Sequence, residues 1–180
     1  MGSAEYPVWD GSQWVPISLP VIDGEGFVVP NVAAIIFRDE SKRELLLQRR
    51  NAPDVTRGLL ELPSGGWRAG EDPWQALSRE VREETGLELR TAQTASLRYE
   101  AHEGRPFVSS RPAAVTVGVE GAYPVLHLAY VCFAAGEPTG PTAEALDPQW
   151  YPVDEVRRLL ETPARFTGPT FAILSSYFEA

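Results

Sequence analysis

The chain has 180 residues and is acidic, with a net charge of −9 at neutral pH. Its length suits one domain with a real hydrophobic core, and its 43% hydrophobic content argues against disorder. No apolar run approaches the roughly 20 residues of a membrane span, no signal peptide opens the chain, and no basic patch offers a surface to nucleic-acid polymers. The single cysteine, Cys132, cannot form an internal disulfide, so we expect a cytoplasmic protein.

Residues 1–30 are predicted to form a hairpin-like extension ahead of a core at residues 31–160. The segment Trp9-Asp10-Gly11-Ser12 contains Asp-Gly, a strong signal for a hairpin turn, and a second turn is expected at 23–26. Strands are then predicted over residues 32–37, 44–48 and 59–62 from their apolar patterns. Residues 62–66 contain two glycines and are expected to form a tight loop whose backbone approaches a ligand closely.

A helix is predicted next. Asp72 followed by Pro73 is typical of a helix start, and Gln75 is placed to complete a capping box. Gly86 is the expected left-handed stop, which gives a helix of about three and a half turns. At 100° per residue Trp74, Leu77 and Val81 share one stripe, which we expect to face the core.

The second half of the chain is predicted to alternate strands and loops before two helices. Strands are expected near residues 95–99, 113–119 and 126–133, the last nearly all apolar and hence central. Residues 101–112 and 136–141 are expected to be loops. A short helix is expected over 154–160 with Asp154 as its cap, and a C-terminal helix within 161–180 that buries Phe171, Leu174 and Phe178. Strands and helices intermixed in this way indicate a single α/β domain with a mixed sheet.

One motif in the predicted helix carries the chemistry. Between Gly65 and Leu87 the chain follows the pattern Gly-x5-Glu-x7-Arg-Glu-Val-x-Glu-Glu-x-Gly-Leu. Glu80, Glu83 and Glu84 fall on one arc of the helix surface, where three like charges repel each other, and Arg79 and Arg82 are expected to point elsewhere. A hard divalent cation, Mg²⁺ or alternatively Mn²⁺, would resolve this repulsion, because such ions prefer carboxylate and carbonyl oxygens.

At every defining position this segment resembles the signature of the Nudix hydrolases. The resemblance implies an α/β/α sandwich and metal-dependent hydrolysis of a nucleoside diphosphate linked to another moiety. It also implies a salt bridge between Glu71 and Arg79 that orients the helix, with Gly65 and Gly86 as further structural support. The metal ligands that it implies are the backbone carbonyl of Ser64 and the carboxylates of Glu80, Glu83 and Glu84. Since an acidic protein would repel a polyphosphate, a metal must lie between the two.

The general base is left open among several carboxylates. Within the family it is either a glutamate of the motif, here Glu83 or Glu84, or a glutamate from a later loop. Glu144 lies six residues before Trp150, which resembles the spacing of the distal glutamate before the tryptophan-containing strand in several family members. Glu144 also fits an ordinary surface position. Weaker candidates are Glu100, Glu103 and Glu120.

The substrate is indicated only by short segments. Residues 61–65, Glu-Leu-Pro-Ser-Gly, are similar to the Glu-Leu-Pro-Ala-Gly stretch of ADP-ribose and ADP-sugar pyrophosphatases. Trp67 stands where members that act on (d)NTPs more often carry lysine. We therefore expect a small nucleoside diphosphate derivative as substrate, with ADP-ribose or a nucleotide sugar preferred. The alternatives are a (d)NTP pyrophosphohydrolase and a non-catalytic nucleotide sensor. Candidate substrate contacts, each of which also fits an ordinary surface or packing role, are Arg49, Arg57, Trp67 and Arg68. A homodimer is left open.

Overall fold

The computed structural model describes residues 2–9, 13–21, 28–92, 97–100, 106–119 and 124–179. In chain order the elements are β1 (Gly2–Trp9), β2 (Trp14–Val21), β3 (Val29–Phe37), β4 (Glu44–Arg50), β5 (Leu60–Glu61), β6 (Ser64–Gly66), α1 (Pro73–Thr85), β7 (Leu89–Ala92), β8 (Leu97–Glu100), β9 (Pro106–Ser109), β10 (Ala114–Gly118), β11 (Val125–Ala134), β12 (Ala145–Pro152), α2 (Val153–Leu159), η2 (Pro163–Arg165) and α3 (Gly168–Glu179).

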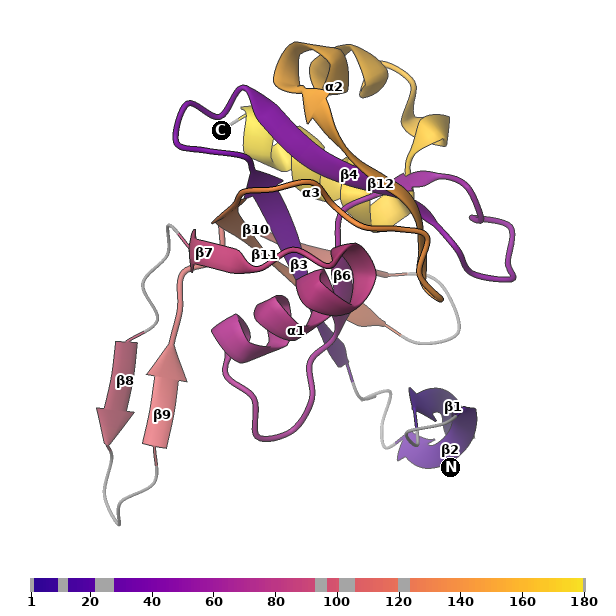
Figure 1. Ribbon diagram of the computed structural model, residues 1–180. Coiled ribbons are helices and arrows are strands. Elements are labelled where there is room, and N and C mark those ends of the chain that lie inside the picture. Colours follow the sequence, from indigo (N-terminus) through magenta and orange to yellow (C-terminus); the bar gives the residue numbers. More distant parts are fainter. Residues whose placement is uncertain are drawn as a thin grey trace.

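A mixed sheet forms the centre of the molecule (Figure 1). Its strand order is β10-β11-β3-β4-β12, with β5, β6 and β7 paired to β4, β3 and β11 respectively. Strands β3 and β11 run parallel, and the other pairs in this sheet are antiparallel. These two central strands are almost wholly apolar along their buried stretches, because strands covered on both faces leave few positions for polar side chains.

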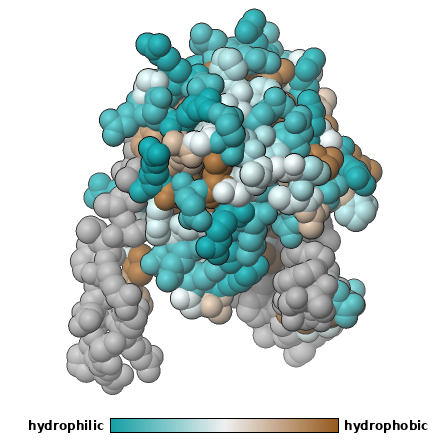
Figure 2. Space-filling model, in the orientation of Figure 1, coloured by the Kyte–Doolittle hydropathy of each residue, from teal (hydrophilic) through white to brown (hydrophobic). Residues whose placement is uncertain are grey.

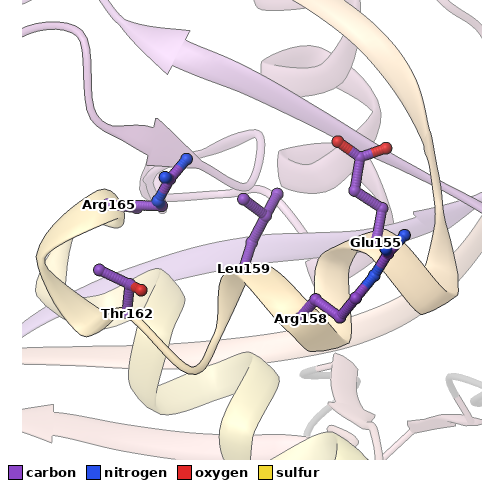
Figure 3. A pocket seen from close by; sticks show the side chains of 5 residues that line it. All are labelled: Glu155, Arg158, Leu159, Thr162 and Arg165. Atoms are coloured by element: carbon purple, nitrogen blue, oxygen red, sulfur yellow. The ribbon is translucent and has the colours of Figure 1, made fainter.

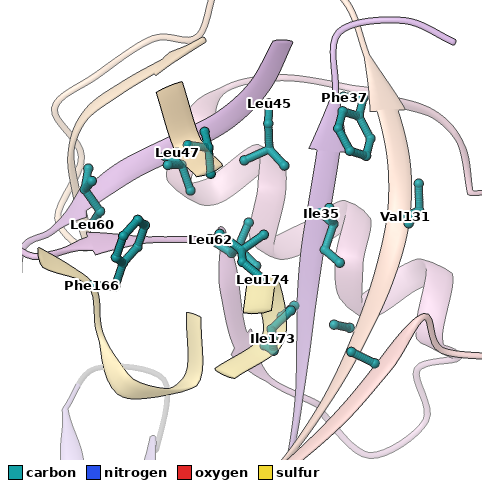
Figure 4. Packing of buried hydrophobic residues seen from close by; sticks show 14 of the residues in the cluster. Ile35, Phe37, Leu45, Leu47, Leu60, Leu62, Val131, Phe166, Ile173 and Leu174 are labelled. Atoms are coloured by element: carbon teal, nitrogen blue, oxygen red, sulfur yellow. The ribbon is translucent and has the colours of Figure 1, made fainter. Parts of the chain in front are cut away.

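The two faces of the sheet are covered by different helices. Alternate residues of β3 point to opposite faces, so Ile35 and Phe37 pack in one core and Ala34 and Ile36 in the other. The first core contains Ile173, Leu174 and other residues from the C-terminal part of the chain (Figure 4). The second contains three residues of α1, namely Ala76, Leu77 and Val81. The fold is therefore an α/β/α sandwich with a mixed sheet, as predicted.

The C-terminal helices differ from the prediction in detail. Helix α2 begins after Pro152 and has no side-chain cap, whereas Asp154 lies inside its first turn, where its charge still suits the helix dipole. In α3 the buried residues are Thr170, Ile173 and Leu174, while Phe171 and Phe178 are only partly buried against the first core. The large aromatic rings lie at the edge of this interface, because aliphatic side chains fill its centre.

Two segments predicted to be loops contain strands. Residues 106–109 form β9, which pairs with β8, so a proline-containing part of the predicted loop is extended because a partner strand supplies its hydrogen bonds. Residues 64–66 form β6 and pair with β3 at Ala33, Val32 and Asn31. Residues 89–92, which carried no strand prediction, form β7 on β11. In each case pairing with a strand distant in sequence decides the conformation.

The N-terminal strands β1 and β2 pair antiparallel, with Trp9 opposite Trp14. The predicted turns at residues 10–12 and 23–26 lie outside the described residues, as do Glu103 and Glu120. In the part of the chain that the structure describes, no helix combines the length and the apolar character needed to cross a membrane. Hydrophilic residues dominate the face shown in Figure 2, which includes the region of α1.

Candidate functional site

Helix α1 is defined at both ends by local chemistry. The Asp72 carboxylate accepts a hydrogen bond from the Gln75 backbone N–H at 2.9 Å. In turn, the Gln75 side-chain oxygen accepts one from the Asp72 backbone N–H at 2.8 Å. Pro73 occupies the first turn, and Gly86 ends the helix with a φ of 71°. These features match the predicted start and stop, so the register of the side chains on α1 is set by its own sequence.

The helix presents one apolar and one acidic side to the sheet. Leu77 and Val81 are buried in the second core as predicted, together with Ala76, whereas Trp74 is only half-buried. Glu80 and Glu84 are also buried, with 5% and 4% of their surfaces exposed. Burying two carboxylates on one helix is costly unless they are paired or bind a cation.

Three carboxylates converge at this side of the helix. Glu80 and Glu84 of α1 meet Glu144, which is exposed and directly precedes β12, so that a ligand oxygen from each lies within 4.8 Å of the others. Glu83, predicted to be a metal ligand, is not part of this group; 46% of its side chain is exposed. The tertiary structure thus combines two glutamates of the motif with the distal glutamate.

Glu84 is held by two hydrogen bonds to the same oxygen. Its Oε2 accepts from the Gln48 side-chain amide at 2.8 Å and from the Ser64 backbone N–H at 3.1 Å. Complete burial raises the pKa of the Glu84 carboxyl well above its usual range, the nearby Glu61 raises it further, and the bond from Gln48 opposes this shift. Ser64, predicted as a metal ligand through its carbonyl, therefore lies beside the cluster.

Glu80 is enclosed by a glycine and an arginine. A Cβ atom on Gly65 would lie 2.3 Å from the Glu80 Cδ, so only glycine leaves room for this carboxylate. Gly65 does not have a positive φ, so close packing against Glu80, and not backbone conformation, requires glycine at this position. The Arg79 guanidinium contacts Glu80 and lies 3.5 Å from Glu83, which corrects the expectation that Arg79 points away from the acidic arc.

The predicted ion pair between Arg79 and Glu71 is present. The Arg79 Nε donates to Glu71 Oε1 at 2.6 Å and its Nη2 to Glu71 Oε2 at 2.9 Å, which is a bidentate arrangement. The same Nη2 also donates to the Gly66 carbonyl at 3.0 Å. These hydrogen bonds lower the pKa of the Glu71 carboxyl. Arg79 thus ties the loop before α1 to the helix and to β6.

The donor set fits a hard divalent cation. Carboxylate oxygens are the preferred ligands of Mg²⁺ and Mn²⁺, and the described residues contribute three of them to one point. Burial also raises the pKa of Glu80, the second carboxyl of the group, although contact with Arg79 opposes this shift. A divalent cation would add positive charge at the point where Glu80, Glu84 and Glu144 meet.

Comparison with known proteins agrees with this geometry. The family model described as the NUDIX domain matches residues 28–170. The chain belongs to the Nudix family. An RNA pyrophosphohydrolase of Halorhodospira halophila is 40% identical over 67 residues, which are 37% of this chain and 33% of that protein. The alignments to the first curated relatives span about a quarter to two-fifths of those proteins.

Solved Nudix structures share the fold at low sequence identity. A MutT Nudix hydrolase from Burkholderia pseudomallei is 21% identical, with a TM-score of 0.61 over 84% of this chain and 98% of that one. The Nudix domain of NrtR from Shewanella oneidensis, solved in complex with ADP ribose, is 14% identical with a TM-score of 0.60. That match covers 86% of this chain and 89% of the NrtR domain.

Sequence reasoning missed the polar residues that surround the Nudix helix. Gln48 is fully buried in β4 beside Glu84, and Glu61 is buried opposite Gln48 in β5. Burial raises the pKa of the Glu61 carboxyl to about 7, against the opposing effects of Arg50 and Gln48. The sequence signal for this contact is Gln48 itself, a polar residue directly after three leucines in a strand. A buried polar side chain needs a hydrogen-bond partner, so such a residue indicates a polar group nearby.

Three of the four predicted substrate contacts, Trp67, Arg68 and Arg49, have partners within the protein. Trp67 is half-buried and donates its indole N–H to the Glu71 carbonyl at 3.0 Å. Arg68 is exposed and lies 3.6 Å from Glu83, which places one cation next to the acidic helix. Arg49 donates to the Gly58 carbonyl at 2.9 Å, and Arg57 is exposed in the segment between β4 and β5.

A surface depression of about 270 Å³ lies away from these residues, over α2 and η2 (Figure 3). It is lined by Glu155, Arg158, Leu159, Thr162 and Arg165. None of these belongs to the carboxylate cluster or to the Nudix motif. We therefore assign the functional site to the cluster on α1.

Proposed function

We propose that this Nudix protein hydrolyses a phosphoanhydride bond in a nucleoside diphosphate linked to another moiety, with ADP-ribose or a nucleotide sugar as the preferred class. The observation that carries this proposal is the convergence of Glu80, Glu84 and Glu144 within 4.8 Å. Two of these residues come from the complete Nudix motif and the third comes from a distant loop. A retained acidic site argues for catalysis over simple nucleotide binding.

Mg²⁺ or Mn²⁺ would be held by this cluster, with the Ser64 carbonyl and the nearby Glu83 as the further ligands that the sequence predicts. When bound, the cation supplies the positive charge that a diphosphate needs on its oxygens during displacement. The protein has a net charge of −9, so an acidic site would repel the diphosphate unless a cation lies between them.

Among the carboxylates, Glu144 suits the role of general base best. It is exposed, so a water molecule can reach it, and it faces the two buried glutamates. Glu84 is buried, and one of its oxygens already accepts two hydrogen bonds. We therefore assign proton removal from the attacking water to Glu144, and the holding of the cation mainly to Glu80 and Glu84.

Two arginines would bind the substrate phosphates and hold the catalytic helix in position. Arg68 is the exposed cation nearest to the acidic helix among the predicted contacts, and arginine matches the geometry of phosphate oxygens. Arg79 braces the loop before the helix through Glu71. The ADP-ribose preference is supported by the Glu-Leu-Pro-Ser-Gly stretch, and the bound ADP ribose of the NrtR domain supports a ligand of this class.

A turnover assay with the purified full chain and Mg²⁺ tests the proposal. The panel contains ADP-ribose, nucleotide sugars, dinucleoside polyphosphates, (d)NTPs and 5′-triphosphorylated RNA, with products separated by chromatography. We expect a nucleotide product from at least one member, its loss with EDTA or with Glu84→Gln, and a strong decrease with Glu83→Gln. Glu144→Gln should lower turnover at least about tenfold, as expected for the loss of a general base.

The matched control is Glu88→Gln, which removes one negative charge just beyond the helix, where Glu88 is exposed. Its turnover should equal that of the wild type. Tight nucleotide binding without any product would assign the protein to the sensor class, and an absence of Mg²⁺ and Mn²⁺ uptake in calorimetry would remove the metal site. Unchanged turnover in Glu144→Gln would exclude that residue as the base.

A further inference from the structure

The exposed glutamate of the cluster depends on a loop for its position. Glu80 and Glu84 are placed by the rigid helix α1, but Glu144 belongs to the irregular segment between β11 and β12. Within this segment, the Thr142 hydroxyl accepts hydrogen bonds from the backbone N–H groups of Glu144 at 3.3 Å and of Ala145 at 3.0 Å. These local bonds shape the turn, but they do not connect it to the rest of the site.

Asn51 makes that connection. Its backbone N–H donates to the Glu144 carbonyl at 2.9 Å, and its side-chain amide donates to the carbonyls of Thr142 at 3.1 Å and Ala143 at 3.2 Å. Three consecutive carbonyls are therefore bound by one residue. Only an amide side chain of this length offers two N–H groups to neighbouring carbonyls while its backbone N–H is also engaged.

Asn51 is itself well anchored. It follows directly on β4, and β4 pairs with β12 so that Arg50 lies opposite Ala145. The same strand carries Gln48, whose amide binds Glu84. One rigid strand end thus contacts both the buried carboxylate and the loop of the exposed one, which fixes the distance between them.

We propose that Asn51 is a positioning residue that acts through Glu144: by binding the carbonyls of residues 142–144, it holds the Glu144 carboxylate at the cluster. The inference rests on the proposed function, in which Glu144 serves the reaction. Loss of the Asn51 side-chain amide frees the carbonyls of Thr142 and Ala143, while the backbone bond from Asn51 to Glu144 remains. The fold stays intact, because the freed carbonyls lie near the surface and can bind water. The loss lets the loop move, so Glu144 spends less time near Glu80 and Glu84.

A double-mutant cycle between Asn51→Ala and Glu144→Gln tests this assignment, because residues that act as a unit have non-additive effects. We expect Asn51→Ala to lower kcat about fivefold or more in the wild type, with KM changed less than about twofold. In the Glu144→Gln background the same change should lower kcat by less than about twofold. Asn51→Ser, whose single hydroxyl donor cannot bind two carbonyls at once, should repeat the result.

A second cycle uses binding of Mn²⁺ alone, measured by calorimetry or electron paramagnetic resonance. We expect Asn51→Ala to weaken Mn²⁺ binding about threefold or more in the wild type and by less than about twofold in Glu144→Gln. The control is Thr139→Val, which removes a different side-chain bond of the same loop, from the Thr139 hydroxyl to the Thr85 carbonyl. It should leave both readouts within about twofold.

Equal effects of Asn51→Ala in both backgrounds would overturn the proposal, as would an unchanged kcat and Mn²⁺ affinity in the single variant. If the wild type converts no substrate of the panel, the proposed function fails and the Mn²⁺ cycle alone decides the role of Asn51. If the wild type does not bind Mn²⁺ either, this inference and the cation site fall together.

Discussion

At the scale of single residues, the site depends on close contacts that admit little change. Gly65 and Glu80 share one such contact, since the glycine leaves the space that the buried carboxylate occupies. Gln48 and Ser64 form another, because both bind the same oxygen of Glu84. Each of these contacts involves a carboxylate of the cluster, so we expect small substitutions to affect cation binding more than folding.

Gly65→Ala should therefore weaken the cation site. The new Cβ would lie 2.3 Å from Glu80 Cδ and must displace that side chain. We expect Mn²⁺ affinity to fall at least about tenfold, whereas the free energy of unfolding of the metal-free protein should change by only about 1 kcal/mol, because the flexible end of the side chain yields.

Gly66→Ala is the matched control for this prediction, since a Cβ there would meet no atom within 4 Å. It should bind Mn²⁺ as the wild type does. Calorimetric titration with Mn²⁺ and urea unfolding in EDTA measure the two quantities. Wild-type affinity in the Gly65→Ala variant would show that Glu80 is not needed where the structure places it.

At the scale of elements, α1 is the unit that places the chemistry. Its capping box, its proline start and its left-handed glycine stop all lie within the helix or next to it. Because these signals are local, the sequence predicts the bounds of α1 and the spacing of its glutamates. The strands around it are different. β9 and β6 exist because β8 and β3 pair with them, and no local pattern indicated those partners.

The C-terminal stop of α1 is also a packing contact. Gly86 has a φ of 71°, and a Cβ there would lie 2.1 Å from the Thr139 hydroxyl oxygen. We expect Gly86→Ala to lower the free energy of unfolding by about 2–4 kcal/mol, of which about 1 kcal/mol is the cost of the left-handed backbone and the rest the clash.

Gly70→Ala separates the two contributions. Gly70 has a φ of 87°, but no atom lies within 4 Å of the added Cβ, so only the backbone cost of about 1 kcal/mol remains. Urea unfolding of both variants gives the comparison. Equal losses would show that Thr139 moves away without cost and that the Gly86 contact is not tight.

At the scale of the whole molecule, a buried acidic layer connects the site to the sheet. The Gln48 side chain donates a hydrogen bond to Glu84, and Gln48 lies opposite Glu61 on the neighbouring strand. Arg50 lies 3.6 Å from Glu61. Burial raises the pKa of the Glu61 carboxyl from its ordinary 4.5 to about 7, so the folded protein binds this proton more tightly than the unfolded chain does. Stability then depends on pH.

The direction of this dependence follows from the raised pKa. The contribution to stability is fully present below pH 4.5 and is lost as the pH rises through about 7. In EDTA, we expect the wild type to lose stability between pH 5 and pH 8 and Glu61→Gln to lose about 1–3 kcal/mol less over the same interval. The raised pKa of buried Glu84 also lowers stability as the pH rises, and it does so in both the wild type and Glu61→Gln.

Urea unfolding at the two pH values measures this difference. The control is Glu88→Gln, which removes the same charge from an exposed position and should keep the wild-type slope. The same pH dependence in Glu61→Gln and the wild type would show that Glu61 is ionised in the folded protein throughout this range.

The sequence by itself determined the family, the α/β class and the helix that carries Glu80, Glu83 and Glu84. It did so because capping residues and helical spacing act between neighbours in the chain. It also singled out Glu144 from its spacing to Trp150. It could not determine which carboxylates meet, because that depends on how α1 and the loop with Glu144, 60 positions beyond Glu84, pack on the same sheet.

Only the tertiary structure brought Glu144 to Glu80 and Glu84 and left Glu83 exposed. It also gave Asn51 and Gln48 their roles, since both side chains bind groups that are distant in sequence. The physical reason is the same in each case. Hydrogen bonds and burial at this site join segments from four parts of the chain, and such contacts form only when the sheet assembles.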